Sequence, residues 1–343
     1  MSDHLEFISC DWGTSTFRLR WVFDAGRVVV REIRESSGVR ALYEQAQSTG
    51  ALAQAERGAI FEAYLRQQLE KLVEGQGRFA EPVPLVVSGM ASSTVGWREL
   101  PYAALPFQLN GSGLSHAEIK WAGPDWISNT HLISGAAHSA DIMRGEEIEV
   151  VGIMASEEMS AAREASLLVL PGTHSKHIHV RGGAVVDFQT YMTGELFDVL
   201  GRHSLLRASV QVDSTGGASP SVELPGGDRT AFEEGVRHAR QCGLAGGLFR
   251  VRTRSVLDRS AVGENTRFFS GLVIGSELIP LQSVTCPIFI AATGALANLY
   301  SIALGELLGA DTGWQCVQPG TMARATIRGQ GMFLKTWIDS RKP

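Results

Sequence analysis

The sequence predicts an α/β protein with mixed sheets, arranged as two related halves. Twice along the chain an apolar strand ends in a glycine-threonine turn and a second strand follows, over residues 7–16 and 168–177. A third apolar, β-branched run comes after each pair, at residues 28–33 and 184–188. Each half is therefore expected to begin as a three-stranded meander. A repeat separated by about half the chain indicates two domains rather than a solenoid.

The rest of the first half follows from apolar periodicity. An apolar stripe at helical spacing predicts a covering helix over residues 54–74. Two apolar runs predict strands at residues 85–90 and 131–135. The stretch 97–106 is irregular, and residues 141–152 are expected to form a helix followed by a connection.

Helix-start signals organise the second half. Thr193 is the expected N-cap of one helix, and Thr230-Ala231-Phe232-Glu233 fits a capping box that opens another, through about residue 245. The Gly/Pro/Ser-rich passage 214–228 is expected to be a surface loop. Residues 287–292 form a predicted buried strand, which Thr293-Gly294 turns into a further helix.

The composition allows two ordinary cores and disfavours several partners. With 343 residues, 44% of them hydrophobic, the chain is long enough for two domains, which we place at 1–160 and 161–343. A formal net charge of −5, without a long cluster of Lys and Arg, disfavours nucleic acid as a partner. The four cysteines form no Cys-x-x-Cys pair and are expected to be reduced core thiols.

Neither an export signal nor a membrane span is visible in the sequence. The first six residues are acidic and lead straight into a strand, whereas a signal peptide begins with a basic and then an apolar region. No uninterrupted apolar run reaches the roughly 18 residues of a membrane span. We therefore expect a soluble, cytoplasmic protein with no membrane partner. The sequence leaves the oligomeric state open, and a homodimer is compatible with it.

The two glycine-threonine turns suit the binding of phosphate. Glycine lets the backbone approach an anion, while amide N–H and hydroxyl groups point at it. Each turn alone is typical of an ordinary β-hairpin, but equivalent positions in two similar segments favour two halves facing one nucleotide. Asp11 is a natural ligand for Mg²⁺, acting through water. The expected phosphate ligands are Gly13, Thr14, Ser15 and Arg18 from the first turn, and Gly172, Thr173, His174, Ser175 and Lys176 from the second.

Other nucleotide and metal sites are disfavoured. No Gly-x-x-x-x-Gly-Lys-Ser/Thr sequence occurs, which removes the P-loop class, and no Gly-x-Gly-x-x-Gly follows the first strand. His174, His177 and His179 lie on one predicted strand, but the first two cannot share a strand face. No fourth metal ligand is evident, so we expect these histidines to be structural.

Phosphoryl transfer also needs a base for the attacking hydroxyl, and the segment 141–147 is the best candidate. Asp141 could accept the hydroxyl proton while Arg144 holds an anionic substrate. The same residues are equally typical of a solvated helix face with an i,i+3 ion pair. Competing carboxylates are Asp187, Glu195 and Asp198.

Two small-residue segments are candidates for the adenosine site. They are residues 269–277, with Gly271 and Gly275, and residues 293–298, with Thr293, Gly294 and Asn298. Small residues at a strand-to-helix turn let a flat base lie against the backbone. Each signal is weak alone, because glycine is common at such turns.

The order of two phosphate motifs and an adenosine motif resembles the superfamily of sugar kinases, actin and heat-shock chaperone ATPases. The resemblance implies two ribonuclease-H-like, actin-like ATPase domains with mixed sheets flanked by helices. These domains would close a cleft on ATP and Mg²⁺. Residues 144–147 are also similar to a Gly-x-Glu-Glu stretch of exopolyphosphatases, in which a glutamate activates water. That similarity implies that Glu146 or Glu147 shares or replaces the role given to Asp141.

More narrowly, the chain resembles the 2-dehydro-3-deoxygalactonokinase family over nearly its whole length. The supporting segments are 11–15, 89–102, 141–147, 171–176 and 191–197. The sequence departs from the family pattern at Ala91-Ser92-Ser93-Thr94 and at Ala292-Thr293-Gly294. The resemblance implies a sugar-acid pocket, for which the candidate residues are Gly89, Met90, Ser92, Trp97, Tyr102, Arg144 and Glu195.

The family resemblance implies ATP-dependent phosphorylation of the terminal hydroxyl of 2-dehydro-3-deoxy-D-galactonate. Three alternatives stay open at the level of sequence. They are a kinase for the gluconate-derived epimer, a phosphohydrolase of the exopolyphosphatase kind, and a nonenzymatic nucleotide switch or filament protein. Trp97, Tyr102 and Arg144 favour a small-molecule acceptor over a protein partner.

Overall fold

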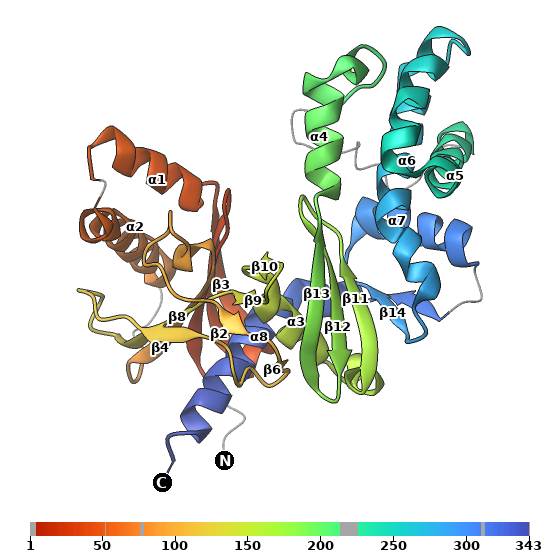
Figure 1. The fold of residues 1–343 in the computed structure, drawn as a ribbon. Helices are drawn as coiled ribbons and strands as arrows, with labels where there is room; N and C mark the ends of the chain where they lie inside the picture. Colours follow the sequence, from red (N-terminus) through yellow and green to blue (C-terminus); the bar gives the residue numbers. More distant parts are fainter. Residues whose placement is uncertain (1–4, 52, 76–78, 213–225, 310–312, 343) are drawn as a thin grey trace. The chain divides into compact units, whose positions relative to one another are not determined.

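The computed structural model describes residues 5–51, 53–75, 79–212, 226–309 and 313–342. The chain divides into two compact units, drawn with their helices and strands in Figure 1. Unit 1 comprises Met1–Arg163, Arg181–Asp187 and Ala323–Pro343, and unit 2 comprises Glu164–Val180 and Phe188–Met322. The expected division at residues 160 and 161 stays a prediction.

Unit 1 is built on a six-stranded mixed sheet in the order β3-β2-β1-β4-β8-β7. β1 pairs antiparallel with β2 and parallel with β4. A small sheet in the order β10-β9-β5 belongs to the same unit. The strands are β1 (Phe7–Trp12), β2 (Phe17–Phe23), β3 (Val28–Glu35), β4 (Val83–Gly89), β5 (Ala103–Ala104), β6 (Phe107–Gln108), β7 (His116–Glu118), β8 (Ile127–Ile133), β9 (Ala136–Ala137) and β10 (Ile142–Met143), and the helices are α1 (Val39–Ser48), α2 (Gln54–Val73), α3 (Glu146–Met154) and α8 (Pro319–Asp339).

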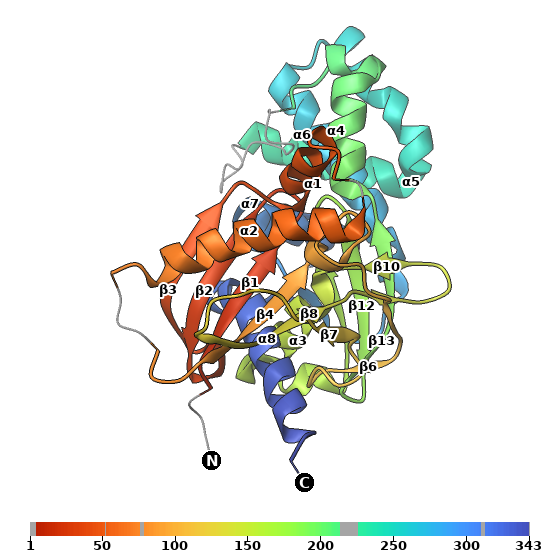
Figure 2. The ribbon, with the colours of Figure 1, turned by 90° about the vertical axis from the view of Figure 1, so that its left-hand side faces the viewer.

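Side-chain alternation along β1 gives this sheet one apolar and one polar face. Ile8, Cys10 and Trp12 are fully buried in a core to which α2 contributes an apolar stripe, and Figure 2 shows α2 crossing that face. Asp11 is out of phase with them and therefore lies on the opposite face. The Gln330 side-chain amide of α8 donates to the Cys10 carbonyl and to the Ser88 hydroxyl, both at 2.9 Å.

Unit 2 repeats the strand order of unit 1. The second six-stranded sheet runs β15-β14-β11-β12-β13-β6, so that β13-β12-β11-β14-β15 matches β3-β2-β1-β4-β8. β11 and β14 are parallel, and β13 and β6 are antiparallel. The expected meander in each half and the α/β class with mixed sheets are confirmed. The elements are β11 (Ala165–Leu170), β12 (Ser175–Arg181), β13 (Ala184–Tyr191), β14 (Ile288–Ile290), β15 (Trp314–Cys316), α4 (Thr193–His203), α5 (Gly226–Val256), α6 (Val262–Leu278) and α7 (Gly294–Leu308).

The expected helix over residues 141–152 is wrong at its beginning. Residues 142 and 143 form β10, and α3 starts only at Glu146. Gly145 stands before it at φ +108°, a backbone conformation that L side chains rarely adopt and that ends helical geometry there. Asp141 and Arg144 are therefore not an i,i+3 pair on one helix face.

Several expectations for the second half are also wrong. Thr193 is the first residue of α4 rather than its cap, and Thr230 lies inside α5 instead of opening it. α5 consists of two helices joined at a kink at Gly243, close to the expected end at about residue 245, and the second of them runs on to Val256. Of the expected loop 214–228, residues up to 225 lie outside the described residues and the last three belong to α5.

The cysteines and the glycines of α6 also differ from expectation. All four cysteines are free, but Cys242 and Cys316 are exposed and only Cys10 is fully buried. Residues 269–277 form no strand-to-helix turn, because they lie within α6. No helix among the described residues has the length and apolar character needed to span a membrane.

Candidate active site

The first glycine-threonine turn, at residues 13–16, has a fixed backbone and an exposed tip. Gly13 donates its N–H to the Thr16 carbonyl at 2.9 Å, while Thr14 and Ser15 are exposed. The start of α1 fixes the turn, because the Arg40 N–H donates to the Thr14 carbonyl at 3.1 Å. Such a turn presents hydroxyl and N–H groups without having to reorganise.

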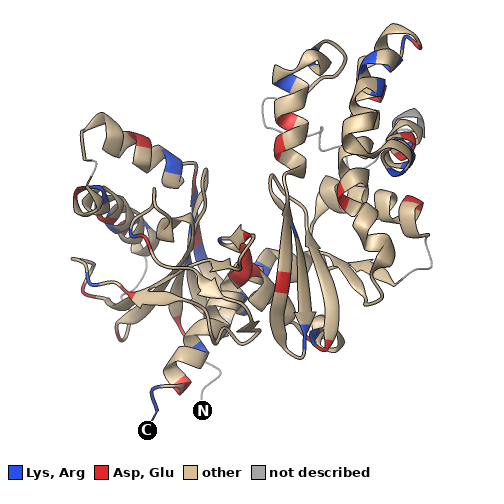
Figure 3. Ribbon diagram, in the orientation of Figure 1, with Lys and Arg blue, Asp and Glu red and all other residues tan. Residues whose placement is uncertain are grey.

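Asp11, at the end of β1, lies beside an arginine and a glutamate. The Arg18 guanidinium is 3.2 Å from the Asp11 carboxylate, and both side chains are partly exposed. The pKa of Glu149, in the first turn of α3, is raised to about 7, mainly by burial and then by repulsion from Glu146 and Asp11. The first turn of α3 is acidic, and Figure 3 colours the acidic residues of the ribbon red.

This group fits a magnesium ion that keeps most of its water. Mg²⁺ is typically bound by one or two carboxylates together with water and phosphate oxygens. Asp11 supplies one carboxylate, and a cation relieves the kind of repulsion that raises the pKa of Glu149. No cluster of three or more His, Cys, Asp or Glu that could hold a metal ion occurs within the described part of the chain. A magnesium ion at Asp11 would therefore take the rest of its ligands from water and phosphate oxygens.

Arg144 is held rigidly between a serine and an aromatic ring. Its Nη1 donates to both the carbonyl and the hydroxyl of Ser92, each at 2.5 Å. Its guanidinium carbon lies 4.3 Å from the centre of the Tyr102 ring, a cation–π distance. The half-buried guanidinium keeps Nε and Nη2 for the planar, two-point recognition of a carboxylate.

The remaining predicted pocket residues divide between the core and the surface. Trp97 is only 2% exposed, and its indole N–H donates to Glu62 of α2. It therefore anchors the segment 89–102 in the core. Gly89 has φ +91°, and a Cβ there would lie 2.8 Å from the Trp12 carbonyl, which only glycine permits. Met90 is half-buried beside it, and Ser92 is fully buried.

The three candidate bases differ in their surroundings. Asp141 is half-buried and its carboxylate accepts the N–H of Ile142 at 2.7 Å. Glu146 is also half-buried and accepts the N–H of Arg144 at 3.0 Å. Glu147 is fully buried, and burial raises its pKa to about 8. Glu147 is therefore protonated at neutral pH.

The second glycine-threonine turn is fixed by the start of α4. Glu195 N–H donates to the Thr173 carbonyl at 3.1 Å. A Cβ at Gly194 would lie 2.7 Å from the Gly172 carbonyl, so the two backbones are in close contact. Gly172 is half-buried and Thr173 exposed, which leaves the tip of the turn accessible.

The side chains after this turn have distinct partners. The side chains of His174 and Glu195 are 2.5 Å apart, so the predicted phosphate and substrate residues form a hydrogen-bonded pair at the surface. Lys176 is only 4% exposed, and its ammonium donates to the His174 carbonyl at 3.1 Å. Ser175 is fully buried behind the turn.

The two adenosine candidates have different local structures. Thr293 and Gly294 are exposed where β14 leads into α7, and Asn298 is half-buried one turn further. Gly271 and Gly275 instead face α5. A Cβ at Gly271 would lie 2.0 Å from the Phe232 carbonyl, so close packing between two helices accounts for this glycine.

Sequence reasoning missed two carboxylates, Glu149 and Glu277. Glu149 follows Glu146 by three residues, a spacing that places both on one side of a helix, but its proximity to Asp11 comes only from the fold. Glu277 is buried in α6 and accepts hydrogen bonds from residues more than twenty positions away in sequence. No sequence pattern around Glu277 predicts these contacts.

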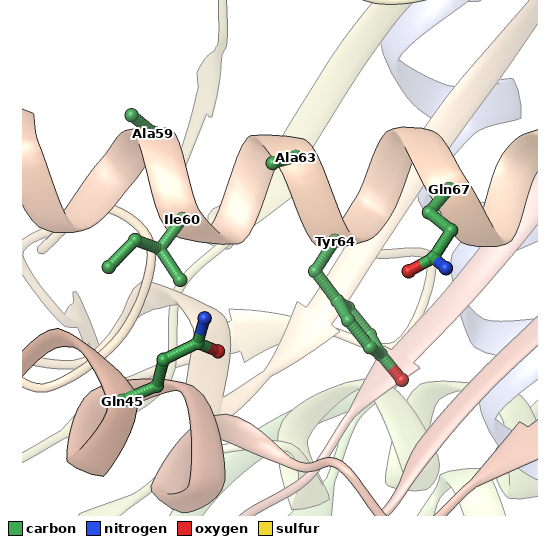
Figure 4. A pocket seen from close by; sticks show the side chains of 6 residues that line it. All are labelled: Gln45, Ala59, Ile60, Ala63, Tyr64 and Gln67. Carbon is green, nitrogen blue, oxygen red and sulfur yellow. The ribbon is translucent and has the colours of Figure 1, made fainter.

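A pocket between α1 and α2 lies apart from these residues. Figure 4 shows its lining, which includes no charged side chain and none of the predicted site residues. It is lined by Gln45, Ala59, Ile60, Ala63, Tyr64 and Gln67.

Comparisons with known proteins relate the whole chain to one group of kinases. The family model for 2-keto-3-deoxy-galactonokinase matches residues 11–329. A Rhizobium meliloti (strain 1021) protein named "Probable 2-dehydro-3-deoxygalactonokinase DgoK1" is 30% identical over 310 residues, 87% of this chain and 88% of that protein. The Escherichia coli (strain K12) 2-dehydro-3-deoxygalactonokinase is 31% identical over 206 residues, 59% of this chain and 62% of its own.

A solved structure shares the fold. The crystal structure of a Sinorhizobium meliloti protein bearing the name of the same kinase has a TM-score of 0.71 and 25% identity, over 96% of this chain and 99% of that one. The likeness confirms the expected fold class, and the family model spans both predicted phosphate turns and the Arg144 segment. The chain belongs to the 2-keto-3-deoxy-galactonokinase family.

Proposed function

We propose that the protein transfers the terminal phosphoryl group of ATP to the terminal hydroxyl of 2-dehydro-3-deoxy-D-galactonate. The observation that carries this proposal is the family match over residues 11–329, which includes both phosphate turns and the arginine pocket. As a member of this family the chain is a phosphotransferase, with ATP as its co-substrate. The phosphohydrolase and the nucleotide switch are not favoured by that membership.

Phosphate binding falls to the two turns. Phosphoryl transfer depends mainly on positioning and on neutralising charge, and each turn offers a fixed backbone with exposed hydroxyl or N–H groups. We assign the phosphates to Gly13, Thr14 and Ser15 in one turn and to Gly172 and Thr173 in the other. Asp11 would hold Mg²⁺ through water, and the ion would supply positive charge to the phosphate oxygens when bound.

The sugar acid is recognised through its carboxylate. Arg144 is the cation for this role, because the hydroxyl and carbonyl of Ser92 and the ring of Tyr102 fix its plane. A fixed guanidinium binds a carboxylate at two points with less loss of side-chain freedom than a mobile one. This arrangement favours a small anionic acceptor over water.

Asp141 is the proton acceptor that we propose, with Glu146 as its alternative. Both are half-buried carboxylates in the segment that carries Arg144. Glu147 is assigned a structural role, since a carboxyl with a pKa of about 8 is already protonated at neutral pH. Loss of activity in Asp141→Asn but not in Glu146→Gln supports the assignment, and the reverse overturns it.

A coupled assay of ADP release tests the proposed reaction. Each member of a panel of 2-keto-3-deoxy acids is offered with Mg²⁺-ATP, and inorganic polyphosphate is offered separately. We expect ADP release with the galactonate-derived acid at least about 10-fold faster than with its gluconate-derived epimer, because a buried donor left unpaired costs about 1–3 kcal/mol. Phosphate release from polyphosphate without a sugar acid would contradict the proposal.

A further inference from the structure

Glu277 is a buried carboxylate whose two oxygens both accept two hydrogen bonds. It lies near the end of α6 and is 3% exposed. One oxygen accepts from the Ser175 hydroxyl at 2.7 Å and lies 3.0 Å from Nε2 of His177. The other accepts from the Thr193 hydroxyl at 2.5 Å and from the Tyr300 hydroxyl at 2.6 Å. The carboxylate is therefore fully satisfied, as a buried charge must be.

These four partners come from the elements that surround the second phosphate turn. Ser175 and His177 begin β12, directly after the turn, and Thr193 begins α4. Tyr300 lies in α7, the helix that follows the exposed Thr293-Gly294 segment. One side chain thus joins the strand that leaves the turn, the helix that abuts it, and the helix behind the candidate adenosine segment.

The start of α4 is in turn in contact with the backbone of the turn. Glu195 N–H donates to the Thr173 carbonyl, and Gly194 approaches Gly172 so closely that no Cβ fits. A movement of Thr193 by a few tenths of an ångström is therefore transmitted to residues 172 and 173. The His174 side chain of the turn and the Glu195 side chain of α4 are also linked, 2.5 Å apart.

We propose that Glu277 is a positioning residue for nucleotide binding, which holds the second phosphate turn in place through Ser175 and Thr193. This inference rests on the proposed function, because it takes Gly172 and Thr173 as phosphate ligands. Glu277 touches neither the nucleotide nor the sugar acid. Its effect is to keep the turn's N–H groups preorganised for the phosphates.

The substitution Glu277→Gln tests this role with almost no change in volume. The amide NH₂ faces two of the four donors and can accept from neither, so one pair of hydrogen bonds is lost or rearranged. We expect KM for ATP and Kd for Mg²⁺-ADP, the latter by titration calorimetry, to rise about 10-fold. KM for the sugar acid is expected to stay within about twofold of the wild-type value.

A second pair of variants covers the case in which Glu277→Gln fails to fold. Thr193→Val removes the hydroxyl at constant shape, and Thr193→Ser retains it. We expect Thr193→Val to weaken Mg²⁺-ADP in the same direction as Glu277→Gln, and Thr193→Ser to restore binding. Equal binding by Thr193→Val and Thr193→Ser overturns the inference.

Glu234→Gln is the matched control for loss of a carboxylate elsewhere in unit 2. Glu234 accepts from the buried Arg254 at 2.6 Å, and neither residue contacts the turn. This variant is expected to unfold at a lower temperature while its KM for ATP stays unchanged. A merely structural Glu277 would behave in the same way, with a lower Tm and an unchanged KM for ATP, and the inference would then be wrong.

The two proposals fail in different ways. If the wild-type protein releases no ADP with any sugar acid, the proposed reaction is wrong, while calorimetry with Mg²⁺-ADP still tests Glu277. If the wild type is active and Glu277→Gln binds Mg²⁺-ADP as tightly as the wild type does, only the positioning role is wrong.

Discussion

Two carboxyl groups of α3, those of Glu147 and Glu149, have raised pKa values. Glu147 is fully buried, with one oxygen accepting the Gly145 N–H at 2.7 Å and the other without a hydrogen-bond partner. Glu149 is half-buried and faces Asp11, with a pKa of about 7. In both groups burial is the largest cause of the raised pKa, and repulsion from Glu146 is the next.

The raised pKa of Glu147 predicts that stability falls as the pH rises. The native state holds this proton up to about pH 8, whereas an unfolded glutamate releases it near 4.5, so native stability is greatest at low pH and declines between these values. We expect Glu147→Gln to reduce the slope of unfolding free energy by up to about 1.4 kcal/mol per pH unit in that window. Urea unfolding from pH 5 to 8 measures it.

Glu44→Gln is the control for this pH dependence. Glu44 is exposed on α1. Its substitution should leave the pH dependence of stability as in the wild type. Identical slopes for Glu147→Gln and the wild type would show that Glu147 does not hold its proton.

At the scale of elements, glycines set how closely helices pack. α3 and α8 cross where a Cβ at Gly152 would lie 1.7 Å from the Ala325 carbonyl and one at Gly329 would lie 2.0 Å from the Ile148 carbonyl. α5 and α6 approach in the same way at Gly235 and Gly271. In both pairs the backbones touch, so the positions of α3 and α6 depend on residues without a side chain.

An added methyl group at the α3–α8 crossing is expected to destabilise the protein. Gly152→Ala cannot be accommodated without moving one backbone, and overpacking of this kind costs about 1–3 kcal/mol or more. Gly305→Ala is the matched control, because this helical glycine of α7 has no atom within 4 Å of its added Cβ. It should be neutral or stabilising by up to about 1 kcal/mol. Thermal unfolding of both variants compares them, and a Tm of Gly152→Ala at or above that of Gly305→Ala contradicts the packing argument.

At the scale of the whole molecule, each unit carries one phosphate turn on the same pattern of strands. In unit 1 the turn joins β1 to β2, and in unit 2 it joins β11 to β12. The central strand of each sheet therefore delivers its polar turn at its carboxyl end, where open α/β sheets place ligands. Our proposed function assigns the phosphates of one nucleotide to both turns, and such binding would make stability depend on that nucleotide.

Mg²⁺-ATP is accordingly expected to stabilise the protein against heat. At a free concentration of about 100 times Kd, binding contributes about 2.7 kcal/mol to the native state. Because we assign Asp11 to the metal, EDTA should remove most of the increase in Tm, and Asp11→Asn should have the same effect without EDTA. Differential scanning fluorimetry gives the comparison. An increase in Tm that survives EDTA would remove the need for magnesium at Asp11.

Local patterns in the sequence determined the strands, the turns and the family. Alternation and β-branching predict the two meanders, and glycine followed by threonine marks both turns, because these signals depend on residues adjacent in the chain. The same motifs led to the family that the whole-chain match confirms. Helix starts were predicted less well, since Gly145 and Thr193 act through backbone conformation and distant contacts.

Only the tertiary structure decided which polar groups are buried together. Glu277 lies 102 positions from Ser175 in sequence, and no periodic pattern links two such residues. Likewise the segment around Gly271 and Gly275 is rich in small residues, as a ligand-binding turn is. In the structure these two glycines allow α6 to pack closely against α5. Sequence specifies what each segment prefers to form, whereas the burial of a charge depends on neighbours that only the folded chain assembles.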